Sequence, residues 1–185
     1  MSCPNRVLLI SGKRKSGKDY IAEKLCTLLD GKCCILRISE PIKSYYATTH
    51  NLSLEALMSD GPLKEKYRKS MTEWSEEQRF KDPGCFCEAA CTKAEAKELW
   101  IVSDVRRKTD MEWFKKTYGE KIRSVRIETD LETRKDRGWN FVEGIDDTIG
   151  ECGLDDYDSW DLMINNNSDD TLKENLQSLV KLIAI

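Results

Sequence analysis

Five short apolar segments recur along the chain and are separated by stretches with helical periodicity. They are RVLLIS (6–11), CCILRIS (33–39), LWIVSD (99–104), SVRIET (124–129) and DLMIN (161–165). Most are continuous runs rather than alternations, which is typical of strands covered on both faces. Apolar residues at helical spacing follow the last segment: Leu172, Leu176, Leu179, Val180 and Ile183. The pattern predicts an α/β fold, with a five-stranded parallel sheet and helices on both faces.

Two stretches exceed the minimal strand–helix pattern. Residues 40–98 are mostly helical in pattern, and residues 131–150 are short, charged and contain glycine. In an α/β sheet, ligands lie beyond the carboxyl ends of the strands, so insertions there usually shape a site. We therefore predict a single domain over residues 1–185, with a helical substrate-binding insertion at 40–98 and a lid at 131–150.

Composition narrows the possible partners and location. The 185 residues carry a net charge of −3, which does not suggest a nucleic-acid binder. No apolar run approaches the roughly 20 residues that cross a bilayer, and the N-terminus does not resemble a signal peptide. We expect a monomer in the cytosol, without a membrane or nucleic-acid partner.

The eight cysteines are expected to be reduced. Without a secretory signal, disulfides are not expected. CFCEAAC (85–91) resembles a metal site superficially, but a structural zinc site needs four well-spaced ligands, and His50 is the only histidine. We predict that the cysteines act as small hydrophobic residues.

The segment LLISGKRKSGKD (8–19) has the form of a phosphate-binding loop. Gly12 and Gly17 frame it, and a predicted strand precedes it while a helix follows. Inward-pointing backbone N–H groups and the helix N-terminus would attract phosphate, and Lys18 would reach the β- and γ-phosphates. The alternative is a simple turn with solvated lysines. We predict that the nucleotide is bound by Lys13, Arg14, Lys15, Ser16, Gly17, Lys18 and Asp19.

Asp19 stands where a phosphate-binding loop usually has a hydroxyl. Its carboxylate could hold Mg²⁺ directly or through water, or it could stabilise the helix dipole. Asp104 ends a predicted strand and could orient the metal through its waters, or it could cap a helix. We predict that both acids serve a Mg²⁺ site.

Further cationic residues lie at positions that could face the same site as the phosphate-binding loop. Arg106 and Arg107 follow Asp104 and offer planar forks for phosphate oxygens. Lys64 and Arg68 are four residues apart and share a helix face. The others are Lys43, Arg79, Arg134 and Arg137. Each alone is equally typical of an exposed surface charge.

In combination, these motifs resemble the animal-type phosphomevalonate kinase family, small P-loop kinases of the mevalonate pathway. The shared pieces are SGKRKSGKD, LKEKYRK, DPGCFC, VSDVRR, WFKKTYG, DRGWNF and ECGLDD. The resemblance implies a nucleoside-monophosphate-kinase-like fold. It also implies ATP- and Mg²⁺-dependent phosphorylation of (R)-5-phosphomevalonate (mevalonate 5-phosphate) to the 5-diphosphate.

The resemblance further implies roles for individual residues. Lys18, Arg106 and Arg107 would be catalytic, and the loop from Lys13 to Asp19 would cradle ATP. Further ATP contacts would come from Arg134, Arg137, Asn167 and Asn175, the last two standing where the family pattern has histidine and glutamine. The acceptor would be held by Lys43, Lys64, Arg68, Arg79, Arg106, Arg107 and Asn166.

A phosphate acceptor of this kind does not need a strong general base, which agrees with the single histidine of the chain. A phosphate monoester has a second pKa near 6 and is already a nucleophile at neutral pH. The main obstacle is repulsion between two polyanions, which clustered cations offset.

Other readings remain. The nearest is a different small-molecule or nucleoside monophosphate P-loop kinase. A GTPase switch would need DTIG (147–150) to follow a strand, and a single-stranded RNA binder would need more basic character. The acidic stretch 143–161 could be a second metal site or a solvated lid hinge.

Overall fold

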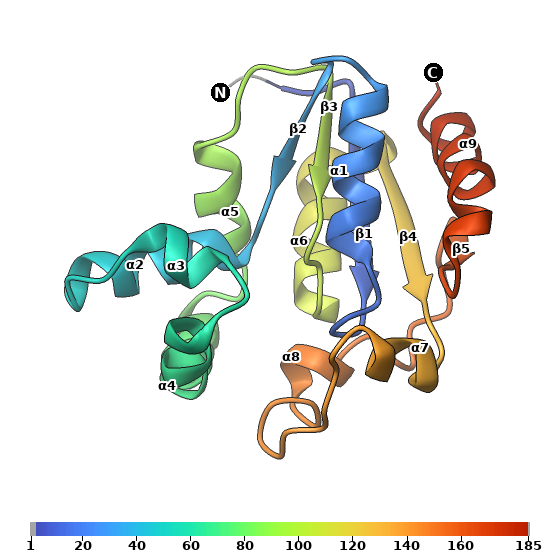
Figure 1. The fold of residues 1–185 in the computed structure, drawn as a ribbon. Helices are drawn as coiled ribbons and strands as arrows, with labels where there is room; N and C mark the ends of the chain where they lie inside the picture. The colour runs from blue at the N-terminus through green and yellow to red at the C-terminus, as the bar shows by residue number, and fades with distance from the viewer. Residues whose placement is uncertain (1–2, 185) are drawn as a thin grey trace.

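A single five-stranded sheet organises the molecule (Figure 1). The computed structural model describes residues 3–184. Its strands are β1 (Arg6–Gly12), β2 (Cys33–Leu36), β3 (Leu99–Val102), β4 (Ile122–Glu128) and β5 (Leu162–Asn165). They pair in the order β2-β3-β1-β4-β5, and every pairing is parallel. This confirms the predicted α/β fold and the five predicted strands.

The strands are continuously apolar because helices cover both faces of the sheet. Residues of β1 alternate between two core clusters. Leu8 and Ile10 pack with α1 (Lys18–Leu28) and α9 (Leu172–Ile183), whereas Leu9 packs with residues of α5 (Cys85–Thr92) and α6 (Lys108–Tyr118). Cys87 and Cys91 of α5 are buried in the cluster that contains Leu9, as expected for cysteines that act as small hydrophobic residues.

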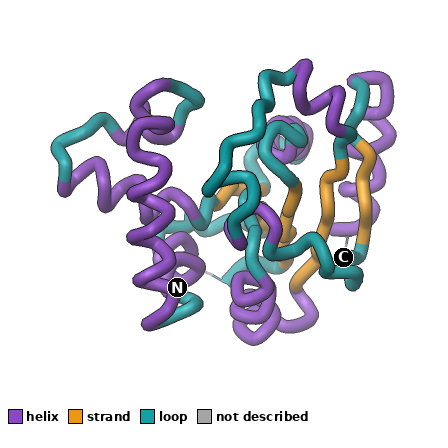
Figure 2. Tube along the Cα trace, turned by 90° about the horizontal axis from the view of Figure 1, so that it is seen from below, coloured by secondary structure: helices purple, strands orange, loops and turns teal. Residues whose placement is uncertain are grey.

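The insertion after β2 forms a helical unit beside the sheet (Figures 1 and 2). It contains α2 (Ser39–Thr49), α3 (Leu54–Met58) and α4 (Pro62–Lys81), and it leads into α5. Tyr46, Leu57 and Met71 make a small apolar cluster of its own. α4 has 20 residues but many charges, and no helix within residues 3–184 is long and apolar enough to cross a membrane.

The segment between β4 and β5 lies across the carboxyl ends of the strands, at the bottom of Figure 1. It contains two short helices, α7 (Leu131–Asp136) and α8 (Ile149–Cys152). Two 3-10 turns complete the described elements, η1 (Gly119–Lys121) and η2 (Asp169–Thr171). The predicted lid range, 131–150, therefore sits beside the loop that follows β1.

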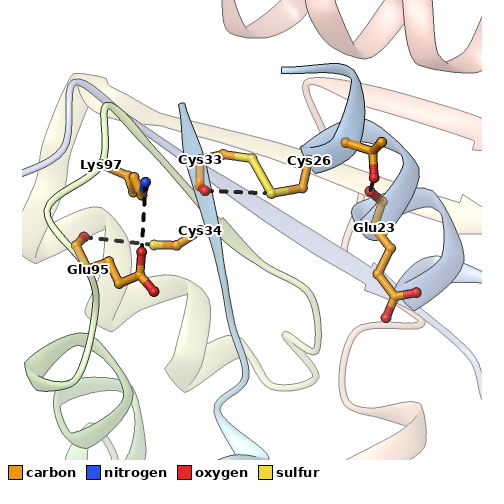
Figure 3. Close-up of a disulfide and its surroundings, with 7 residues drawn as sticks. Glu23, Cys26, Cys33, Cys34, Glu95 and Lys97 are labelled. Atoms are coloured by element: carbon orange, nitrogen blue, oxygen red, sulfur yellow. Dashed lines mark hydrogen bonds and ion pairs between the residues drawn. A yellow bond between two sulfur atoms is a disulfide. The ribbon is translucent and has the colours of Figure 1, made fainter. Parts of the chain in front are cut away.

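The expectation that all cysteines are reduced is wrong for one pair. Cys26 at the end of α1 and Cys33 at the start of β2 form a disulfide (Figure 3). A short turn brings their Cα atoms to 5.8 Å, which lies within the range that a disulfide spans. The redox compartment carries no information about this local geometry, in which two cysteines seven residues apart face each other across a turn.

Candidate active site

The loop between β1 and α1 folds as a phosphate-binding nest. Lys15 and Gly17 adopt left-handed backbone angles, with φ of 62° and 83°. A Cβ at Gly17 would lie 2.4 Å from the Asn166 amide nitrogen, and one at Gly12 would lie 2.6 Å from Ser16 Oγ. Both glycines are therefore required by close approach, and left-handed residues at alternate positions are typical of a backbone nest that binds anions.

Lys18 is buried at the centre of the site, with 6% of its surface exposed. Burial, and next the positive charge of Arg106, lower the pKa of its ammonium group below the usual value. The carboxylates of Asp19, Glu151 and Asp104 act in the opposite direction. The lysine is thus surrounded by charged groups from its own helix and from two other parts of the chain.

Asp19 fits the chemistry of a Mg²⁺ ligand. Its side chain is half exposed in the first turn of α1, 3.4 Å from Lys18 Nζ, and Ser103 Oγ donates to it. Burial raises the pKa of Asp19, but Lys18 and Arg37 outweigh this effect and hold the pKa below its ordinary value. A charged carboxylate beside the phosphate loop matches the hard oxygen ligands that Mg²⁺ prefers.

Asp104 is engaged in a different way. Its two carboxylate oxygens accept hydrogen bonds from the backbone N–H groups of Ile38 (2.7 Å) and Ser39 (3.0 Å), at the start of α2. The alternative reading of Asp104 as a helix cap therefore holds, although the capped helix is α2 rather than the one that follows Asp104. Each oxygen keeps a further lone pair, so a water-mediated metal role stays a prediction.

Three predicted residues contact the outer side of the phosphate loop. Arg134 Nε donates to the carbonyl of Arg14 at 2.9 Å, and Arg137 donates to the carbonyl of Ser16 at 3.3 Å. The buried amide of Asn166 donates to the same Ser16 carbonyl at 2.8 Å. Asn166 therefore lies against the phosphate loop, and its contact with the acceptor stays a prediction.

A cavity of about 310 Å³ lies next to the loop, at the ends of β4 and β5. Lys13, Thr129, Asp130 and Asn167 are among its lining residues. Asn167 accepts from the backbone N–H of Asp130, at 2.9 Å. Asn175 donates to the carbonyl of Asn165, another lining residue, at 2.9 Å. Asn167 therefore faces this cavity directly, whereas Asn175 supports its wall.

The helical insertion brings its cations towards the phosphate loop through one acid. Asp60 accepts from Lys64 at 2.8 Å and from Lys15 at 2.9 Å, so it joins α4 to the loop. These two hydrogen bonds hold the pKa of Asp60 well below its usual range. Burial, and next the charge of Lys64, lower the pKa of Lys43 to about 8. Arg68 pairs with Glu65, one turn back on α4.

The three remaining predicted arginines meet around Asp110. Arg79 donates to Asp110 at 2.7 Å in a buried ion pair, and the backbone N–H groups of Arg106 and Arg107 donate to the same carboxylate. Arg107 also pairs with Glu76. The Nε atoms of Arg79 and Arg107 are buried and lack a hydrogen-bond partner within residues 3–184. The Arg79 guanidinium thus anchors the segment that carries Arg106 and Arg107, and its contact with the acceptor stays a prediction.

Several residues of this site were missed by the sequence reasoning. Arg126 of β4 donates to Ser11 Oγ and to Asp155, both at 3.1 Å. Asp60 and Glu151 bridge predicted cations from distant segments. The available signal for Arg126 was a charged residue inside a buried strand. Glu151 lies in the acidic stretch 143–161 that the sequence singles out, but no pattern indicated its cationic partners, and Asp60 carried no signal beyond its charge.

Sequence comparison with known proteins identifies a family to which this chain is similar. A family model described as phosphomevalonate kinase matches residues 10–120. A phosphomevalonate kinase of Drosophila melanogaster is 49% identical over 169 residues, which cover 89% of each chain.

Solved structures add the fold alone, since sequence identity to them is low. A Thermus thermophilus protein matches with a TM-score of 0.58 at 14% identity, covering 99% of this chain and 100% of that one. A shikimate kinase from Bacteroides thetaiotaomicron matches with a TM-score of 0.55 at 10% identity, covering 97% and 99% respectively. Both matches support the α/β fold with a parallel sheet.

Proposed function

Because the chain belongs to the phosphomevalonate kinase family, we propose that it transfers the γ-phosphoryl group of ATP to (R)-5-phosphomevalonate. The products are (R)-5-diphosphomevalonate and ADP, in the mevalonate pathway to isoprenoids and sterols. The observation that carries this proposal is the Asp60 bridge, which holds the phosphate loop and the cationic face of α4 together. Two phosphate groups can then approach each other within one cluster of positive charge.

The donor nucleotide is assigned to the side of the site formed by the loop from Lys13 to Asp19. The backbone nest would hold the β- and γ-phosphates, and Lys18 would stabilise the charge that develops on the transferred group. Arg134 and Arg137 reach the loop from the lid, so they are placed to add charge as the lid closes. The adenosine would extend towards the cavity that Asn167 lines.

The acceptor is assigned to the rim that α4 and the segment after β3 form. Its phosphate and carboxylate groups would be held by Lys43, Lys64, Arg68, Arg79, Arg106, Arg107 and Asn166. Two unit charges about 4 Å apart interact by roughly 4 kcal/mol at an effective dielectric of 20, so uncompensated phosphates would repel each other strongly. The acceptor phosphate is already a nucleophile at neutral pH, and positioning with neutralisation is then the main catalytic demand.

Asp19 is the residue that would hold Mg²⁺, and Asp104 would contribute through a water molecule. An ion held there would supply positive charge that offsets the negative charge of the phosphate oxygens. Asp19 can perform this role because Lys18 and Arg37 keep its carboxylate charged. We further propose that the enzyme acts as a cytosolic monomer and that residues 131–150 close over the nucleotide to exclude water.

The decisive experiment is a coupled assay of ADP release by the purified protein with ATP and Mg²⁺. Mevalonate 5-phosphate is compared with nucleoside monophosphates, shikimate and gluconate. We expect turnover that depends on mevalonate 5-phosphate and is at least 100-fold lower with the other acceptors. Turnover with a nucleoside monophosphate instead would replace this proposal by the nearest rival, a nucleotide kinase.

A further inference from the structure

A short acidic segment neutralises much of the site. We call residues 146–155, which include α8, the acidic clasp. Within it, Asp155 pairs with Lys13 at 2.5 Å and Asp146 pairs with Arg14 at 2.8 Å. The backbone carbonyl of Glu151 accepts from Lys13 at 3.1 Å. The clasp therefore holds the first two cations of the phosphate loop.

Glu151 is a buried acid of the clasp, with 7% of its surface exposed. One of its carboxylate oxygens accepts from the backbone N–H of Arg14, and the other accepts from the Arg106 guanidinium. Arg106 also donates to the carbonyl of Gly150 at 3.2 Å. One carboxylate thus spans the phosphate loop on the donor side and an arginine on the acceptor side.

The donors that Glu151 occupies are of the kind that bind phosphate. A backbone N–H in a glycine-framed loop and a planar guanidinium are both preferred partners of phosphate oxygens. A phosphate oxygen cannot accept from the same N–H groups while Glu151 keeps these contacts. A buried carboxylate is also stable here only because it is paired with cations.

We propose that Glu151 is a positioning residue that acts as an internal competitor of the substrate phosphates. Its carboxylate holds the Arg106 guanidinium and the Arg14 backbone N–H close enough for a single anion to accept hydrogen bonds from both. When a substrate phosphate binds these two donors, the Glu151 carboxylate is displaced from them. Anion exchange then replaces one negative charge by another, so the cationic cluster is balanced before and after binding. The inference rests on the proposed role of Arg106 in acceptor binding.

The test compares Glu151→Gln with Glu112→Gln, which removes the same charge from an exposed position on α6. Inorganic phosphate and pyrophosphate are titrated into each protein by calorimetry, and the KM for mevalonate 5-phosphate is measured. We expect Glu151→Gln to bind both anions at least fivefold more tightly and to lower this KM, with Glu112→Gln equal to wild type. Unchanged or weaker anion binding by folded Glu151→Gln would overturn the proposal and leave Glu151 a fixed structural acid.

A second measurement uses the wild-type protein, so it does not depend on the folding of the variant. Hydrogen exchange is followed in peptides that cover residues 146–155, with and without pyrophosphate. Faster exchange with pyrophosphate is expected, because the clasp loses its bridging contact; unchanged or slower exchange would contradict displacement.

Arg106→Gln separates this inference from the proposed function. A normal KM for mevalonate 5-phosphate in this variant would remove Arg106 from the acceptor site, and with it the basis of the inference. A raised KM in Arg106→Gln, together with unchanged anion binding in Glu151→Gln, would overturn the inference alone.

Discussion

The two halves of the site are built by different means. The donor half is shaped by the backbone: two close-packed glycines, left-handed angles at Lys15 and Gly17, and one buried lysine. The acceptor half is built from long side chains on α2, α4 and the segment after β3. Many of its cations are paired with acids, as Lys64 is with Asp60.

The two halves differ in how their positively charged groups are held in position before a ligand binds. Backbone N–H groups carry partial charge and keep their direction without a counterion, so the backbone of the donor half can be rigid. Its side-chain cations Lys13, Arg14 and Lys15 are nevertheless paired with acids, as those of the acceptor half are. Guanidinium and ammonium groups are mobile and repel one another. The acceptor half therefore needs carboxylates to hold its cations apart and in place, and binding there must rearrange existing ion pairs.

The largest effect is expected from Lys18→Met, which removes the buried cation but keeps an apolar stem of similar length. Loss of one preorganised charge at the transferred group should lower kcat by about 10³-fold. Steady-state kinetics and circular dichroism measure the rate and the fold. Lys24→Met, at an exposed position on the same helix, should retain wild-type kcat; an equal loss there would show a general effect on α1.

Gly17→Ala tests whether the donor half depends on backbone shape. The new Cβ would lie 2.4 Å from the Asn166 amide nitrogen, at a residue with φ of 83°. We expect ATP affinity to fall by about 100-fold when the nest is distorted, the equivalent of roughly 2.7 kcal/mol. Gly31→Ala is the matched control, because φ is 76° there but no atom of the described structure lies within 4 Å of the added Cβ. Equal loss of ATP affinity in both variants would mean that backbone strain alone is responsible.

Lys64→Ala should affect the acceptor half selectively. Loss of one charge-assisted contact, worth about 1.5–3 kcal/mol, should raise the KM for mevalonate 5-phosphate by roughly 10- to 100-fold. The KM for ATP should change much less. Lys69→Ala, on the exposed side of the same helix, serves as the control. If ATP binding were lost while acceptor binding remained, the two halves would be assigned the wrong way round.

The smallest effect is a pH dependence from Lys43. The pKa of its ammonium group is about 8 in the folded protein, below the usual 10.5, chiefly because of burial. The charged form attracts the acceptor, so kcat/KM for mevalonate 5-phosphate should fall as pH rises through about 8. Lys43→Arg should flatten this fall, and an identical profile in that variant would assign the titration to another group.

The same shift predicts the opposite trend for stability. Between pH 8 and 10.5 the unfolded chain holds a proton on Lys43 that the folded protein has already lost. The free energy of unfolding should therefore rise with pH across this window. Denaturant titrations at several pH values, with Lys43→Arg for comparison, measure this contribution.

The donor half was predictable from sequence because its information is local. Gly12, Gly17 and Lys18 lie within seven consecutive residues, between a recognisable strand and helix. Glycine spacing and turn chemistry are sufficient to specify such a loop. The parallel sheet was equally accessible, since continuous apolar runs record the covering of both faces.

The acceptor half was predictable in residue type but not in pairing. Asp60 is 45 residues from Lys15, and Glu151 is 45 residues from Arg106, so no periodicity links them. Asp104 was correctly selected as important, yet its backbone partners at the start of α2 are 65 and 66 residues away. Arg79 and Asn166 were placed at the acceptor by resemblance, whereas their observed contacts depend on tertiary packing.

The central position of β1 has a consequence for how the protein is made. Both of its neighbours, β3 and β4, are encoded at least 87 residues after β1. A nascent chain therefore cannot pair β1 on both sides until β4 has been synthesised, and such non-local pairing is slow. We expect nucleotide affinity to appear only after β4 has been synthesised, because the loop that follows β1 has no sheet to hold it before then.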